Sequence, residues 1–152
     1  MITLNIIESS RPSAEWLEGL KAYASVPDAS QDSLLESLLL RACMRVQEMA
    51  DRSILACTLQ LEEDEVENGL VRLYQTIAEV LTVTDGEGNP LEWSKGNHAV
   101  SVGAADHVVI TYRTEPREGN VAELLPVVYQ YATALYDGED PRTLANILTQ
   151  CH

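Results

Sequence analysis

The chain has 152 residues, 45% of them apolar, which is enough for one ordinary domain whose core needs no disulfide or metal. Its 24 acidic residues outnumber its ten Lys and Arg and give a formal net charge of −14. This balance argues against binding to free DNA, because proteins neutralise phosphates with Lys and Arg. It favours solubility, or a surface that repels DNA, such as the lumen of a ring through which DNA slides.

The cysteines and the apolar runs indicate a protein of the reducing bacterial cytoplasm. Cys43, Cys57 and Cys151 lack the paired spacing of a disulfide framework. Residues 1–10 lack the basic start and long apolar stretch of a signal peptide. No apolar run approaches the roughly 18 residues of a membrane span, so we expect no membrane association.

Two helices are predicted in the first third of the chain. The first begins near Ser10 or Ser13 and ends at Val26, because the residue before a proline is biased away from helix. The second runs from about Ser30 to Ala50, and its apolar residues follow the helical period: Leu35, Leu38, Leu39, Ala42, Cys43, Val46 and Met49.

The middle of the chain is predicted to be extended and rich in β-strands. Residues 53–61 look extended, and the run 62–69 is expected to be an acidic loop, with a docking surface or a calcium patch as the alternatives. Asp85 to Pro90 is predicted to be a hairpin turn, and Gly103 to Asp106 to join a second strand pair. The expected short strands are Leu70–Tyr74, Ile77–Thr84, Leu91–Trp93, Ala99–Val102 and Val108–Arg113.

A second long helix is predicted over roughly Val121–Asp137, ended by Gly138. Asn120 and Glu123 have the spacing of a capping box. Pro126 removes an internal hydrogen bond, so either the helix is kinked there or its regular part begins near Glu123.

A last short helix is predicted to begin at Pro141. Its apolar side either packs on the core of the chain or docks into a neighbour, and consists of Leu144, Ile147, Leu148 and Cys151. The order of elements predicts an α+β fold: a small bundle of about four helices with an inserted set of antiparallel β-hairpins. We expect a single domain over residues 1–152, with the β-rich insertion at about 54–113.

Three patterns allow a chemical interpretation, and each has a plainer structural one. Asp85 to Asn89 resembles the start of a calcium loop, but Pro90 and Gly96 stand where that loop needs Gly and Glu, so a hairpin turn is favoured. Asp106–His107 could be a catalytic pair, but no nucleophile motif accompanies it. The possible zinc ligands lack metal-site spacing; they are Cys43, Cys57, His98, Cys151 and His152. We therefore predict no catalytic residue, metal or cofactor.

The chain resembles the head–tail connector proteins (adaptor or head-completion proteins) of tailed double-stranded-DNA phages. The similar segments cover most of it: Trp16–Lys21, Asp28–Asp32, Leu34–Leu38, Asp51–Leu55, Ile77–Gly86, Val108–Tyr112, Leu135–Asp137 and Pro141–Leu148. It departs from the family at Tyr74-Gln75-Thr76, where a proline-rich segment is common, and at the Cys151-His152 end.

This resemblance implies a structural, non-enzymatic subunit of a phage or prophage virion neck. The expected partners are further copies of the chain in a ring, the portal protein, and tail or head-completion proteins. DNA is expected to pass through the ring without sequence-specific binding. Each subunit of a ring uses two different surface patches. The candidate contacts are Asp85, Gly86 and Asn89 in the hairpin turn, and Leu144, Ile147 and Leu148 in the last helix.

Other functions remain open from the sequence. The acidic charge also fits a regulatory binding protein of the DNA-mimic type, which would bind a basic partner with strong salt dependence. A tail-completion or neck protein is a closely related alternative. A small enzyme has no support in the sequence.

Overall fold

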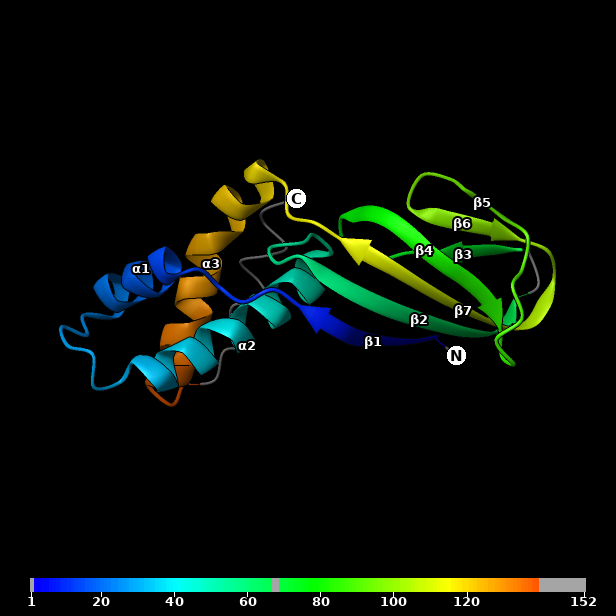
Figure 1. Cartoon of the computed structure of the whole chain (residues 1–152). Coiled ribbons are helices and arrows are strands. Elements are labelled where there is room, and N and C mark those ends of the chain that lie inside the picture. The colour runs from blue at the N-terminus through cyan, green and yellow to red at the C-terminus, as the bar shows by residue number, and fades with distance from the viewer. Residues whose placement is uncertain (1, 67–68, 140–152) are drawn as a thin grey trace. The chain divides into compact units, whose positions relative to one another are not determined.

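The structure is a computed structural model that describes residues 2–66 and 69–139. These residues form two compact units (Figure 1). The β unit consists of residues 2–10 and 56–115, and the helical unit of residues 11–55 and 116–139. Each unit is thus built from two separate stretches of the chain.

The β unit contains two antiparallel sheets (Figure 1). The larger has the order β1-β2-β7-β4, with bounds Ile2–Ser9, Cys57–Val66, Ala105–Thr114 and Ile77–Asp85. The smaller has the order β3-β6-β5, with bounds Leu70–Arg72, Ala99–Val102 and Trp93–Lys95.

One face of the larger sheet is apolar and the other polar, because side chains alternate along each strand. Direct strand partners share a face, so the apolar rows cross several strands. One row joins Leu59, Tyr112 and Val80, and the next joins Leu61, Ile110 and Val83. These residues form the core of the β unit with Val71, Val100 and Val102 of the smaller sheet.

The helical unit contains α1 (Ala14–Ala24), α2 (Asp32–Ala50) and α3 (Glu118–Tyr136). The hydroxyl of Ser13 accepts a hydrogen bond from the Trp16 N–H at 3.2 Å, which confirms the predicted start of the first helix. The buried residues of the three helices are Leu17, Leu20, Leu35, Leu39, Ala42, Cys43, Val46, Gln47, Ala50, Leu124, Val127, Val128, Tyr131 and Ala132. No helix in the described part of the chain is long and apolar enough to cross a membrane.

The predicted bundle of about four helices is wrong. The described residues form three helices and seven strands, and the strands make two antiparallel sheets. The broader α+β class remains compatible with this arrangement. Residues Ile2 to Ser9 form a full strand at the edge of the larger sheet, where the sequence predicted no element. The helix expected from Pro141 lies outside the described residues. The expectation of one domain with an insertion at about 54–113 stays a prediction.

The acidic loop expected at residues 62–69 is also wrong for most of its length. β2 continues to Val66, and Glu62, Glu63 and Asp64 pair with Val109, Val108 and His107 of β7. Glu62 and Asp64 lie on the outer face of the sheet, which meets solvent, whereas Glu63 lies on the face of Leu61 near the end of the strand and stays partly exposed. Backbone pairing with a long neighbouring strand outweighs their low intrinsic preference for strands.

The predicted second hairpin is wrong in its pairing. β6 pairs with β3 and β5, whereas β7 pairs with β2 and β4. The four-residue β6 would satisfy less than half of the ten-residue β7, and β2 and β4 are long enough to pair along it. Strand length, and not proximity in sequence, therefore explains why β7 pairs with β2 and β4.

The turn from Asp85 is confirmed, but the strand that follows it belongs to the other sheet. After the turn, a bridge joins Thr84 and Pro90, and the Leu91 N–H donates to the Val83 carbonyl at 3.0 Å. The chain then leaves for β5 in the smaller sheet.

The second long helix is confirmed, but its predicted cap is wrong. α3 begins at Glu118 after Arg117, so Asn120 lies inside the helix. Pro126 also lies inside it. Gly138 follows the helix with a φ of +76°, as expected for a residue that ends one.

Candidate assembly surfaces

The turn after β4 is held together by the side chain of Asp85. Its Oδ1 accepts hydrogen bonds from the N–H groups of Glu87 at 2.8 Å and Asn89 at 3.0 Å. Its Oδ2 accepts one from Asn89 Nδ2 at 3.2 Å. These bonds, chiefly the one from the Asn89 backbone, hold the pKa of Asp85 below its usual value. The polar groups of Asp85 and Asn89 thus shape the turn, and the whole tip is presented as a preformed surface.

Gly86 brings this turn against the imidazole of His107. A Cβ on Gly86 would lie 3.0 Å from His107 Cδ2, so no larger residue fits without a shift. His107 in turn contacts Asp64 through Nδ1, and its Nε2 lies 3.8 Å from Glu62. The histidine therefore faces two carboxylates of the neighbouring strand β2.

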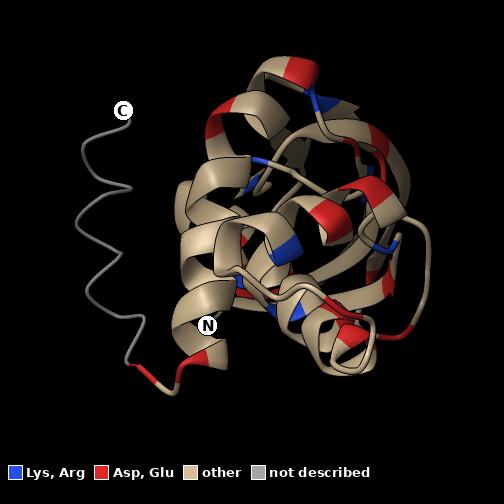
Figure 2. Cartoon of the chain, turned by 90° about the vertical axis from the view of Figure 1, so that its left-hand side faces the viewer, with Lys and Arg blue, Asp and Glu red and all other residues tan. Residues whose placement is uncertain are grey.

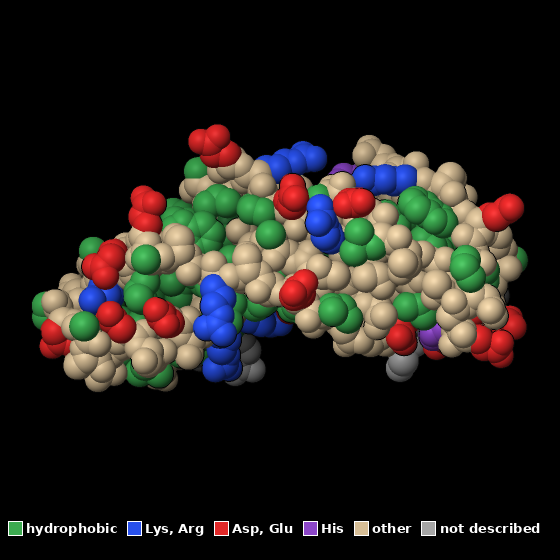
Figure 3. Space-filling model, in the orientation of Figure 1, with side chains coloured by type: hydrophobic (Ala, Val, Ile, Leu, Met, Phe, Trp, Pro, Cys, Tyr) green, Lys and Arg blue, Asp and Glu red, His purple; other side chains and the backbone are tan. Residues whose placement is uncertain are grey.

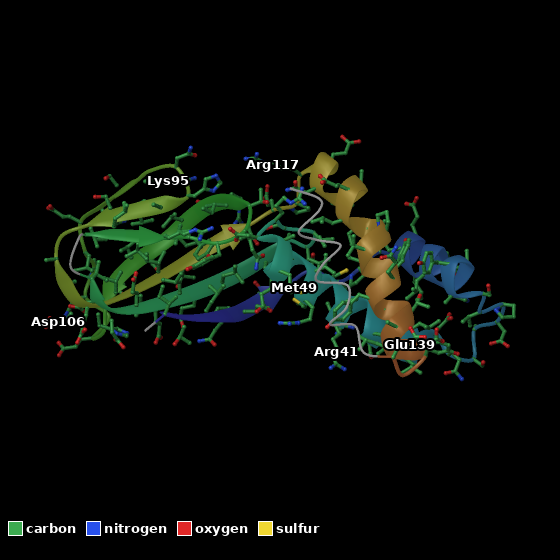
Figure 4. All side chains as sticks on the ribbon, turned by 180° about the vertical axis from the view of Figure 1, so that it is seen from behind. Arg41, Met49, Lys95, Asp106, Arg117 and Glu139 are labelled. Carbon is green, nitrogen blue, oxygen red and sulfur yellow. The ribbon has the colours of Figure 1, made fainter. Side chains whose placement is uncertain are left out.

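These residues lie at one end of the β unit, which we call the acidic end: Glu62, Glu63, Asp64, Glu65, Asp85, Glu87 and Asp106. Figure 3 shows acidic side chains gathered there, and Figure 4 shows the exposed Asp106 at the same end. The β unit carries only Arg72, Lys95 and Arg113 as Lys or Arg residues. The acidic end can repel phosphates or attract a basic protein surface.

The geometry of the described residues supplies no catalytic constellation. Cys43 and Cys57 are buried, and burial raises the pKa of the Cys43 thiol to about 12, so Cys43 is held in its unreactive protonated form. Among residues 2–66 and 69–139, no group of three or more His, Cys, Asp or Glu side chains is placed to hold a metal ion.

The helical unit carries charged residues of both signs (Figure 2) and contains a groove. Several charges are paired, such as Arg45 with Glu48 at 3.2 Å and Arg52 with Glu123 at 2.8 Å. Arg41 of α2 is exposed (Figure 4). The groove has a volume of about 340 Å³ and is lined by Arg11, Pro12, Ser13, Ala14, Leu17, Glu36, Ser37, Leu39 and Leu40.

The two edges of the larger sheet differ in their protection. β4 has irregularities of pairing between Ile77 and Glu79 and between Val80 and Thr82, and such bulges blunt an edge. β1 has one irregularity, between Ile6 and Glu8, and is regular from Ile2 to Ile6. Its large apolar side chains are exposed: Ile2 by 47%, Ile6 by 47% and Ile7 by 56%.

Of the six contact residues proposed from the sequence, three lie in the described part of the chain. Asp85, Gly86 and Asn89 lie together in one exposed turn beside His107, and their role as contacts stays a prediction. Leu144, Ile147 and Leu148 lie outside the described residues. The exposed edge of β1 was missed, although the uncharged and isoleucine-rich run from Ile2 to Ile7 is a signal that could have revealed it.

No protein-family model matches the sequence, and no curated protein is similar to it in sequence. The fold is similar to that of solved chains from gene transfer agent particles. A chain from the neck of an empty particle, computed with C6 symmetry, matches with a TM-score of 0.65 and 15% identity, covering 89% of this chain and 84% of that one. A chain from the virion of a native particle matches with a TM-score of 0.65, 14% identity and the same coverage.

A chain from the neck of a native particle, computed with C12 symmetry, matches over a larger share of both molecules. It covers 93% of this chain and 94% of that one, with a TM-score of 0.59 and 15% identity. The similarity thus extends over nearly the whole chain and includes both units. At this level of identity it establishes a shared fold.

Proposed function

We propose that this chain is a structural, non-enzymatic subunit of the neck of a tailed phage or phage-like particle. The observation that carries the proposal is the shared fold with neck chains of gene transfer agent particles over about nine-tenths of the chain. The chain forms a ring with further copies of itself and joins the portal to tail or head-completion proteins. Before assembly, the free chain is located in the bacterial cytoplasm.

The surfaces of the described residues support a role in assembly. The acidic end repels DNA, which suits a protein that lines or borders a DNA passage without gripping the nucleic acid. The hairpin tip at Asp85–Asn89 is preformed by its own hydrogen bonds, so little conformational entropy is lost when a partner binds it. A ring contact joins two different patches, and the tip is the first of them.

The proposal is tested with the full chain and a portal protein of the same phage or prophage. We expect light scattering and electron microscopy to reveal closed rings, either alone or on the portal. A chain that forms no ring and does not bind the portal at any concentration contradicts the proposal. If that monomer instead binds a basic protein one to one, and salt dissociates the complex, the DNA-mimic alternative is supported.

A further inference from the structure

Among residues 2–66 and 69–139, no strand pairs with the outer edge of β1, and this edge has the features of one that can pair with another strand. β1 is a terminal strand of the larger sheet, and its register with β2 runs from Ile2–Glu63 to Ser9–Cys57. A regular edge strand presents a row of backbone N–H and C=O groups that can template pairing. Proteins usually protect such an edge with charges, prolines or bulges, but the run from Ile2 to Ile6 contains none of these.

The exposed isoleucines of this edge leave apolar surface in contact with water, which is unfavourable. Leu4 and Ile6 pair with the buried Leu61 and Leu59, so they lie on the apolar face of the sheet. Ile2 lies on the same face by alternation, yet Ile2 and Ile6 remain about half exposed at the edge. A neighbouring strand would cover them and complete the apolar face.

We propose that β1 pairs with β1 of a second copy of this chain, antiparallel and centred on Leu4. This register places Ile2 opposite Ile6 of the other copy and Leu4 opposite Leu4, on one face. It places Thr3 opposite Asn5 on the other face. The run is thus complementary to itself, with apolar residues facing apolar ones and polar residues facing polar ones.

Other registers fit less well. A shift by one residue turns the apolar side chains of the second copy to the polar face. Centring the pair on Asn5 places Ile2 opposite the charged Glu8. The register centred on Leu4 avoids Glu8 and the irregularity beside it.

The absence of charge in this run makes it a suitable contact between two copies of an acidic chain. The chain has a formal net charge of −14, so most of its surface repels an identical molecule. The run from Ile2 to Ile6 is uncharged and lies at the edge itself, so it brings no charge of its own to the contact. The two larger sheets then form one antiparallel sheet of twice the width, related by a twofold axis at Leu4. This contact goes beyond the proposed function, since a head-to-tail ring does not require it.

Disulfide cross-linking of the full chain tests the register directly, in a Cys151→Ser background with Cys43 and Cys57 left in place because they are buried. We expect Leu4→Cys to form a covalent dimer on mild oxidation, because directly opposite Cβ atoms lie within reach of a disulfide. A mixture of Ile2→Cys and Ile6→Cys chains should form mixed dimers, several-fold more than either chain alone. Asn5→Cys is the matched control and should cross-link at least fivefold less than Leu4→Cys.

Charge substitution supplies a second readout. Ile6→Lys should raise the dissociation constant of the dimer at least tenfold, because it places a charge on the apolar face at the contact. Leu81→Lys, on the protected edge strand β4, is the control and should leave the dimer unchanged. Equal cross-linking of Leu4→Cys and Asn5→Cys, a chain that stays monomeric, or a dimer that Ile6→Lys leaves intact would overturn the pairing. Because cross-linking reports β1 contacts alone, its failure is distinguishable from a failure to form rings.

Discussion

The hydroxyl of Tyr112 and the backbone of Tyr74 hydrogen-bond to each other twice. The hydroxyl accepts from the Tyr74 N–H and donates to the Tyr74 carbonyl, each at 3.2 Å. Tyr112 lies in the middle of the buried row of the larger sheet, and Tyr74 follows β3 of the smaller one. The pair therefore ties the larger sheet to the segment that joins β3 and β4, through a part-buried polar link beside the apolar core.

Tyr112→Phe is expected to destabilise the protein. The substitution keeps the ring but removes the group that pairs with a backbone donor and acceptor, at a cost of about 1–3 kcal/mol. Urea unfolding followed by circular dichroism measures the change. Tyr23→Phe is the control: the Tyr23 side chain is half exposed, and its loss of a hydroxyl should change the free energy of unfolding by less than about 0.5 kcal/mol.

Gln47→Met should be similarly destabilising in the helical unit. Gln47 is fully buried, and its Oε1 accepts from the N–H groups of Ile54 at 3.1 Å and Leu55 at 3.2 Å. Methionine fills a similar volume but leaves both donors without this acceptor, which costs about 1–3 kcal/mol. Gln31→Met, at the exposed start of α2, should have little effect in the same unfolding experiment. Equal effects of the two substitutions would show that the hydrogen bonds from Gln47 do not stabilise the segment at Ile54 and Leu55.

Gly19→Ala should destabilise α1, against the usual preference of helices for alanine. Alanine in a helix is normally favoured over glycine by about 0.5–1 kcal/mol. Here the added Cβ would overlap the hydroxyl of Tyr129, whose ring lies 6.1 Å from that of Tyr23. Gly119→Ala in α3 meets no atom within 4 Å and is the matched control, expected to be neutral or stabilising.

A second background decides whether the clash is the cause. In a Tyr129→Leu chain, Gly19→Ala should become neutral or stabilising, because the overlapping group is gone. The free energies of unfolding of the four chains form a double-mutant cycle. Additive effects would contradict the close approach of Gly19 and Tyr129.

The sequence correctly predicted the elements that depend on interactions between residues close together in the chain. The start of the first helix at Ser13, the long helix α2 and the turn from Asp85 to Asn89 follow from capping, helical period and turn chemistry within a few residues. These signals do not depend on the rest of the chain, and the structure confirms them.

Pairing between distant strands was not predictable in the same way. β1 pairs with β2 more than 40 residues away, and Glu62 to Val66 join a strand because β7 offers them backbone partners. Long-range pairing of this kind overrides the local preference of acidic residues for loops. The predicted bundle of about four helices was wrong for this reason, whereas the turn from Asp85 to Asn89, which is local, was predicted correctly.

Acid should loosen the turn after β4. The pKa of Asp85 is held below its ordinary value of 3.8 by hydrogen bonds that only the folded turn makes. Its stabilising contribution is therefore fully present above about pH 4 and is lost as the pH falls through the lowered pKa. Carbon-13 NMR titration of the carboxylate measures this pKa directly. Asn89→Gly keeps the backbone donor but removes the side-chain one, and it should move the pKa of Asp85 part of the way back; an unchanged pKa contradicts a role for the Asn89 side chain.

Deleting Asp140 to His152 should separate folding from assembly. The described residues already supply a buried apolar core in each unit, so we expect the shortened chain to keep its circular dichroism and its unfolding midpoint. If Leu144, Ile147 and Leu148 form the second patch of the ring, assembly into rings and binding to the portal are lost together. Leu144→Asp with Ile147→Asp should reproduce this loss without shortening the chain. Intact rings from both variants would assign the second patch elsewhere, and the groove lined by Leu17, Leu39 and Leu40 would then be the next surface to substitute.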